Sequence, residues 1–118
     1  MKKRDVLPLI YACSGCSNVA QLANDVALHF DHSGKAEMSC IAGVGGGVPA
    51  LVRIAQSGRP VIAIDGCQLH CTEACLNNAG VTPEHHFRLY DLDYKKRKKQ
   101  TASEAQFAEV VGLVDAVL

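Results

Sequence analysis

Val61-Ile62-Ala63-Ile64-Asp65-Gly66-Cys67 is the stretch of sequence that decides the fold. Its first four residues are apolar without interruption, which is typical of a strand covered on both faces of a parallel sheet. The polar and glycine residues that follow indicate a turn into a helix, which we expect to run through residues 71–79 and to end at Gly80. The stretch therefore predicts a strand–helix unit with a cysteine beyond the carboxyl end of its strand.

Three similar units surround this one. Further strands are predicted over residues 7–13, 36–42 and 86–92, and amphipathic helices follow over residues 19–33, 49–57 and 103–114. Repeated strand–helix units with right-handed crossovers favour a parallel sheet with helices on both faces. We therefore predict an α/β fold with a mostly parallel four-stranded sheet, Rossmann or flavodoxin-like, in the order 2-1-3-4. No linker or repeat divides the chain, so residues 1–118 are expected to form one domain.

Local signals place the ends of the helices. Asn18, with Gln21 three residues later, is the expected N-cap of the first helix. Residues 101–104 resemble a capping box for the last helix. The glycine-rich residues 43–47 are expected to form a loop that leads to Pro49 in a first helical turn, and they lack the glycine spacing of a dinucleotide-binding loop.

The composition argues against several classes of partner. Twelve basic and twelve acidic residues cancel, and Trp is absent, so neither nucleic acid nor an anionic membrane is an expected partner. No segment approaches the ~20 apolar residues that span a bilayer. Residues 2–4 are basic and precede an apolar run, as in a bacterial lipoprotein signal, but that run is short and contains Pro8. We expect a cytoplasmic protein.

Cysteines follow the ends of three predicted strands. Cys13 closes the first strand, Cys40 comes near the end of the second, and Cys67 follows the third. Cys16 lies in the loop after Cys13, and Cys71 lies at the start of the third helix. Sites in open parallel sheets form beyond the carboxyl ends of the strands, so we expect these five cysteines at one edge.

Such a gathering of thiols favours a thiophilic metal. Zinc takes about four thiolate or imidazole ligands, and it is the metal that we expect first. An iron–sulfur cluster would also suit four thiolates. Helix N-termini lower thiol pKa values, so a thiol-redox or sulfur-transfer protein is the alternative function. A disulfide scaffold is disfavoured, because the long apolar segments supply a core without cross-links.

Other residues near the cysteines have simpler interpretations. Cys75 lies one helical turn beyond Cys71 and is expected to be a buried structural cysteine. Asp65 is expected to cap the turn or to accept hydrogen bonds near the sulfurs. Helical spacing directs His70 away from Cys71, so we expect it to face solvent. His86 is expected at the surface as well.

Three ordered motifs resemble those of the DGC-domain family. They are residues 13–19, residues 38–45, and residues 64–67 together with Cys71, and they extend over almost the whole chain. The resemblance implies zinc binding through four cysteines, without naming a physiological role. Matched to this sequence, the four ligands are Cys13, Cys40, Cys67 and Cys71. Spacing alone would prefer Cys16 to Cys40, so Cys16 is the substitute ligand.

Overall fold

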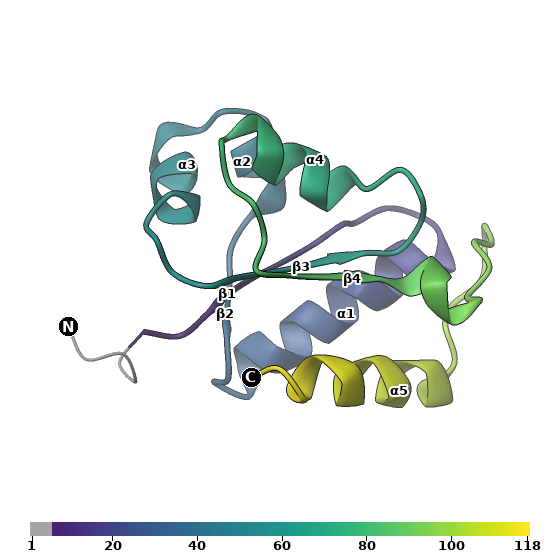
Figure 1. Ribbon diagram of the computed structural model, residues 1–118. Coiled ribbons are helices and arrows are strands. Elements are labelled where there is room, and N and C mark those ends of the chain that lie inside the picture. The colour runs from purple at the N-terminus through teal and green to yellow at the C-terminus, as the bar shows by residue number, and fades with distance from the viewer. Residues whose placement is uncertain (1–5) are drawn as a thin grey trace.

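A computed structural model describes residues 6–118, and a parallel sheet lies at its centre (Figure 1). The strands are β1 (Leu9–Ala12), β2 (Glu37–Met38), β3 (Val61–Asp65) and β4 (His85–Arg88). They pair in the order β2-β1-β3-β4, and every pair is parallel. The predicted α/β fold with strand order 2-1-3-4 is confirmed. The basic residues 2–4 of the signal-like segment lie outside the described residues.

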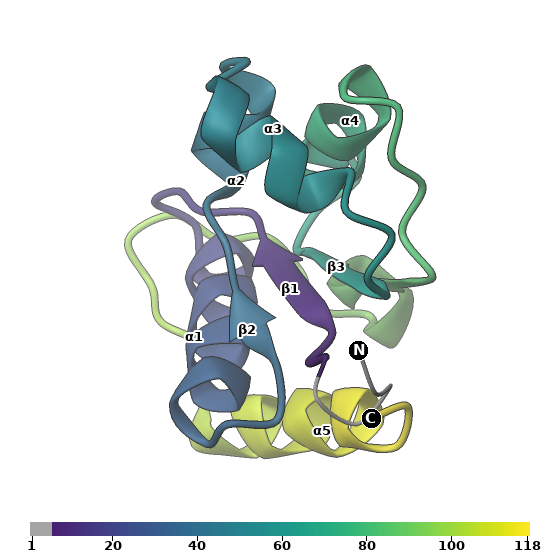
Figure 2. The same ribbon diagram turned by 90° about the vertical axis from the view of Figure 1, so that its left-hand side faces the viewer.

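Helices cover both faces of this sheet (Figures 1 and 2). One face is covered by α1 (Asn18–His32) and α5 (Glu104–Asp115). The opposite face carries α2 (Ile41–Gly45), α3 (Pro49–Ala55) and α4 (Cys71–Asn78). Alternate strand residues supply the two cores, with Ile62 and Ile64 facing α1 and Ala63 facing α4. The continuously apolar run in β3 is therefore buried on both sides, as its sequence predicts.

Three strands are shorter than predicted: β1 is trimmed at both ends, and β2 and β4 end before their predicted last residues. β2 has two residues, because the chain turns into α2 directly after Ser39 and Cys40 becomes the residue before that helix. β4 ends at Arg88, and residues 89–92 form a 3-10 helix, η2 (Leu89–Leu92). Leu89, the first residue of η2, is buried in the same core that Phe87 contacts.

The expected glycine loop is partly helical. Gly43 and Gly45 belong to α2, where missing side chains allow close packing. A Cβ at Gly43 would overlap the side chain of Leu51 in α3, and a Cβ at Gly45 would lie 2.6 Å from the Cys75 sulfur in α4. The glycines therefore join three helices on one face of the sheet.

Two helix caps differ from the prediction. Ser17, not Asn18, caps α1, because its hydroxyl accepts a hydrogen bond from the Ala20 amide at 3.2 Å. The capping box of α5 uses Ser103 and Gln106 in place of residues 101–104. No helix among residues 6–118 has the length and apolar character needed to cross a membrane.

Candidate metal centre at the carboxyl edge of the sheet

Cys13 and the turn that carries Cys67 meet at the carboxyl ends of β1 and β3. These strands are neighbours in the sheet, and the Cys13 amide extends their ladder by donating to the Ile64 carbonyl at 3.1 Å. The Gly66 amide donates to the Cys13 sulfur over 3.3 Å. Parallel pairing therefore brings Cys13 against the Asp65-Gly66-Cys67 turn, although 53 positions separate Gly66 from Cys13.

Gly66 is the residue that makes this approach sterically feasible. A Cβ at this position would lie 2.6 Å from the Val19 carbonyl oxygen, at the start of α1. Real Cβ atoms do not approach a backbone oxygen so closely, and the backbone here cannot give way cheaply. Glycine at position 66 is therefore required for the turn to pack on α1 beside Cys13.

Burial raises the pKa of the Cys13 thiol to about 11. The hydrogen bond from Gly66 opposes this shift, while the nearby Asp65, Cys67 and Cys71 add to it. The surroundings of Cys13 thus collect groups that become negative, and a thiolate there requires a positive charge.

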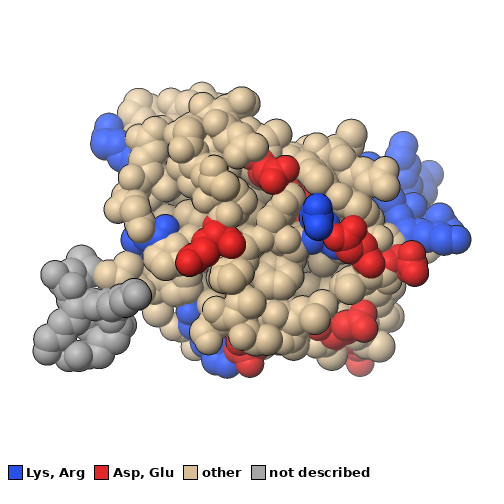
Figure 3. Space-filling view, in the orientation of Figure 1, with Lys and Arg blue, Asp and Glu red and all other residues tan. Residues whose placement is uncertain are grey.

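A basic segment places one positive charge beside the neighbouring Cys67. Residues 95–99, here called the basic strap, are fastened to α1 through Asn18. The side-chain nitrogen of Asn18 donates to the Lys95 carbonyl at 3.0 Å, and the side-chain oxygen of Asn18 accepts from the Arg97 backbone amide at 2.6 Å. Lys96 then reaches the Cys67 sulfur at 3.8 Å. Figure 3 shows the resulting group of basic side chains at one end of the molecule.

The strap and the Cys67 turn enclose an open pocket of about 550 Å³. Cys67, Tyr90 and Lys96 are among its lining residues. The basic strap is exposed along its length, and its bonds to Asn18 hold it at this edge of the sheet. Asn18 is free to bind the strap because Ser17 caps α1.

The remaining cysteines follow strand ends or lie on α4. Cys16 is exposed in the loop between β1 and α1, Cys40 is exposed just before α2, and Cys71 is the exposed first residue of α4. Cys75 is half-buried, with its sulfur at the Gly45 backbone. Burial raises the pKa of Cys75, and Cys71 and Asp65 raise it further. All six cysteines are free thiols.

Asp65 organises a second group of donors next to these thiols. Its carboxylate is 1% exposed and accepts hydrogen bonds from the amides of Thr72 at 2.8 Å and Glu73 at 3.1 Å. These bonds cap the beginning of α4. The Nε2 atom of His86, on the neighbouring strand β4, lies 2.8 Å from the same carboxylate. Asp65 thus joins β3, β4 and α4 at one buried point.

His70, Glu73 and His86 lie around this carboxylate as a compact set. The Nδ1 atom of His70 is 3.2 Å from one oxygen of Glu73, and the Nδ1 atom of His86 is 3.3 Å from the other. The Tyr90 hydroxyl lies 2.6 Å from Nε2 of His70. Within residues 6–118, this is the group of three candidate ligands whose atoms all lie within 4.8 Å, and it includes no cysteine.

The expectation that His70 and His86 face solvent is wrong. His70 adopts a left-handed conformation (φ 53°) before α4, which directs its ring toward Glu73 and Tyr90. His86 is 14% exposed, because β4 places it opposite Ala63 on the face that α4 covers. The alternation with core-facing Phe87 was the available signal for His86. Nothing in the local sequence indicated the turn at His70.

The contacts that the structure shows differ among the four predicted cysteine ligands. It brings Cys13 against the Cys67 turn, and it places Cys71 near enough to Cys13 to affect its pKa. Cys40 follows β2, on the side of the sheet edge where it contributes to the raised pKa of Tyr11 in β1, after burial as the main cause. The ligand set Cys13, Cys40, Cys67 and Cys71 stays a prediction.

Comparison with known proteins gives two findings. The model of the DGC domain matches residues 9–114. A protein of Pseudomonas aeruginosa, named anaerobic and virulence modulator AnvM, is 61% identical over 105 residues, which are 89% of this chain and 79% of that protein. No solved structure matches the chain.

Proposed function

We propose that this chain, which belongs to the DGC domain family, binds a thiophilic metal ion through cysteines at the carboxyl edge of its sheet. Zinc is the proposed metal, with Cys13, Cys40, Cys67 and Cys71 as ligands and Cys16 as the substitute for Cys40. The observation that supports this most directly is the contact of the Cys13 sulfur with the Gly66 amide, in the turn that carries Cys67.

The surroundings of these thiols suit a metal-bound state. An N–H group that donates to sulfur favours the thiolate, which is the form that binds zinc. Four thiolates around Zn²⁺ leave two excess negative charges, and the Lys96 ammonium beside Cys67 offsets part of them. Asp65 lies outside the proposed ligand set, where it holds the start of α4 and hence Cys71 in place.

The alternative of free thiol chemistry has less support. A nucleophilic cysteine must be a thiolate near neutral pH, but burial raises the pKa of Cys13 to about 11. A nearby cation reverses this balance, since a metal stabilises the thiolate directly. Cys13 therefore suits a metal ligand better than a redox or sulfur-transfer nucleophile.

The relative's name suggests a role for such a site. AnvM is named an anaerobic and virulence modulator, so we propose that this chain is also a modulator, and that it responds to bound metal. The proposal places one domain, residues 1–118, in the cytoplasm, where thiols stay reduced. In this role, a protein partner would bind the metal-bound form of the chain in preference to the metal-free form.

The test is the metal content of protein purified without added metal under reducing, oxygen-free conditions. We expect zinc in about a one-to-one ratio with the cysteine site. Replacement by Co²⁺ should then produce the near-ultraviolet charge-transfer absorption of thiolate–cobalt bonds. A metal-free protein without that absorption after cobalt addition would refute the proposal. Broad visible absorption of the purified protein would instead indicate an iron–sulfur cluster.

A further inference from the structure

We propose that His70, Glu73 and His86 form a second metal site, distinct from the cysteines, that takes a divalent ion of the zinc class. One ligand atom from each of the three residues lies within 4.8 Å of the other two, and Nδ1 is the nitrogen of each histidine that faces a carboxylate oxygen of Glu73, at 3.2 and 3.3 Å. Two imidazoles and one carboxylate are a donor set that zinc accepts, with an open position left for water. The site goes beyond the proposed function, because it needs no thiol.

Proton positions in this group support a cation at its centre. Asp65 accepts two backbone hydrogen bonds, and as a buried carboxylate it can only accept from His86. The Nε2 atom of His86 therefore carries a proton. Nδ1 of the same ring faces an oxygen of Glu73 at 3.3 Å, and that oxygen is an acceptor. The two atoms require a positive charge between them, either a proton on Nδ1 or a metal ion bound to both.

The charges of the group lead to the same conclusion. Glu73 and Asp65 are two carboxylates whose ion-pairing partners among residues 6–118 are histidines alone. The nearby Arg88 pairs with Asp91 instead. Zn²⁺ would balance both carboxylates with the imidazoles neutral, which is the form in which they bind metal.

The outer hydrogen bonds match those of ligand histidines. A histidine that binds metal through one nitrogen usually donates from the other to a carboxylate or another oxygen. His86 has Asp65 in that place at 2.8 Å, and His70 has the Tyr90 hydroxyl at 2.6 Å. The ring of His70 also stacks on Tyr90, with centroids 5.6 Å apart. Both ligand nitrogens are therefore aimed before any ion arrives.

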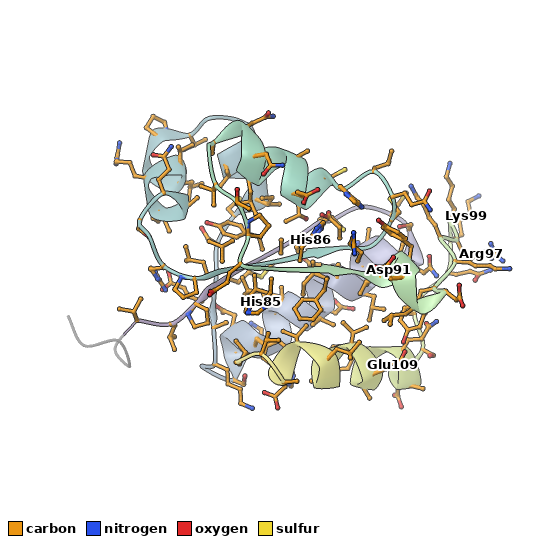
Figure 4. All side chains as sticks on the ribbon, in the orientation of Figure 1. His85, His86, Asp91, Arg97, Lys99 and Glu109 are labelled. Carbon is orange, nitrogen blue, oxygen red and sulfur yellow. The ribbon has the colours of Figure 1, made fainter. Side chains whose placement is uncertain are left out.

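The position of His85 provides a matched control. His85 and His86 are consecutive in β4, so their side chains lie on opposite faces of the sheet (Figure 4). His86 points toward α4 and the proposed site, whereas His85 points toward α1 and α5. Replacing either one removes an imidazole from the same strand, and only His86→Ala removes a ligand.

The experiment is a Zn²⁺ titration of the full chain whose cysteine site has first been filled with zinc. Calorimetry measures the affinity, and ¹⁵N spectra of the imidazoles report which ring nitrogen binds. We expect further zinc to bind the parent through Nδ1 of His70 and His86. Affinity should fall at least tenfold in Glu73→Gln and His86→Ala and stay unchanged in His85→Ala.

Three outcomes would overturn the site. They are no zinc binding beyond the cysteine site, binding that survives His86→Ala, and ¹⁵N shifts at Nε2 in place of Nδ1. In the first case the group is a hydrogen-bonded network with a proton where we place the metal. A titration of Cys67→Ser with Co²⁺ separates this test from that of the cysteine site. Imidazole–cobalt binding without thiolate absorption there would support the second site whatever the cysteines do.

Discussion

The thiol side and the imidazole side of Asp65 differ in how their donors are held. Cysteines arrive from three strand ends, and each depends on the loop that follows its strand. Ligand atoms of His70, Glu73 and His86 already lie within 4.8 Å of one another. Glu73 and His86 are held by the Asp65 carboxylate, which is 1% exposed, and His70 is held by Tyr90. The comparison teaches that loops position the cysteines, whereas buried hydrogen bonds position the histidines and Glu73. Metal binding should therefore order the cysteine loops but leave the histidine site unchanged in conformation.

The sharpest way to break this comparison is to remove a proposed thiol ligand. Cys67→Ser should abolish the thiolate–cobalt absorption, because the hydroxyl is a poor ligand and no other sulfur follows β3 directly. Cys75→Ser is the matched control, since Cys75 packs against Gly45 one turn further along α4. We expect it to keep the metal, and Cys16→Ser to lie between the two. Absorption is measured on reduced protein after stoichiometric Co²⁺. Metal loss in Cys75→Ser with retention in Cys67→Ser would show that the ligand assignment is wrong.

A second prediction concerns the two cysteines that flank the loop after β1. In metal-free, reduced protein, Cys13 should react with iodoacetamide roughly 100-fold more slowly than an ordinary thiol, because burial raises its pKa to about 11. Cys16 is exposed and serves as the internal reference. The Cys13 rate should climb with pH toward 11, because a raised pKa keeps the thiol protonated until then. Mass spectrometry of timed digests measures both rates. Equal rates at neutral pH would revive the thiol-chemistry alternative.

A third prediction sharpens the comparison at Asp65, the residue that the two sides share. Asp65→Asn retains the shape but removes the charge that orients His86 and caps α4. We expect about 10–100-fold weaker Zn²⁺ binding at the histidines. The free energy of unfolding should fall by about 1–3 kcal/mol, since a buried hydrogen-bond partner is mismatched. Urea unfolding and calorimetry give the two values.

Asp91→Asn is the control for this substitution, because Asp91 is half-exposed and pairs with Arg88 at the surface. It should change neither quantity measurably. If Asp65→Asn also changed neither the Zn²⁺ affinity nor the free energy of unfolding, Asp65 would not connect the two sides.

The smallest expected effect is that of a chelator on the fold. Two apolar cores flank β3 without involving any metal, so removing metal should leave the far-ultraviolet circular dichroism of the reduced protein nearly unchanged. A change to the spectrum of an unfolded chain would mean that ligation supplies the folding energy, as in small zinc domains.

The sequence predicts features that depend on neighbouring residues better than features that depend on distant segments. The strand over residues 61–64 follows from a local apolar pattern, and the order of the sheet was assumed as the simplest arrangement of repeated strand–helix units; the structure confirms both. The position of Cys13 beside the Cys67 turn follows from parallel strands, a rule that needs no side-chain detail.

The histidine group could not be predicted in the same way. It depends on the register that sets His86 opposite Ala63 and on a left-handed residue at His70, which helical spacing treats as part of the helix. The early end of β4 at Arg88 was not indicated either, because the alternating pattern of Phe87 and Leu89 fits an extended strand and does not distinguish it from the 3-10 helix that follows. Such features arise from contacts between distant segments, which a pattern along the chain does not contain.

The attachment of the basic strap to Asn18 has a consequence for the order of folding. Its hydrogen bonds link Asn18 to Lys95, which is 77 positions away, and to Arg97, which is 79 positions away. They therefore close a loop that contains most of the chain. Closing so long a loop carries an entropic penalty that neighbouring strands must first reduce. We therefore expect the strap to dock after β1 and β3 have paired. Its amides should exchange with solvent earlier than those of β3, so that Lys96 can leave Cys67 while the sheet stays folded.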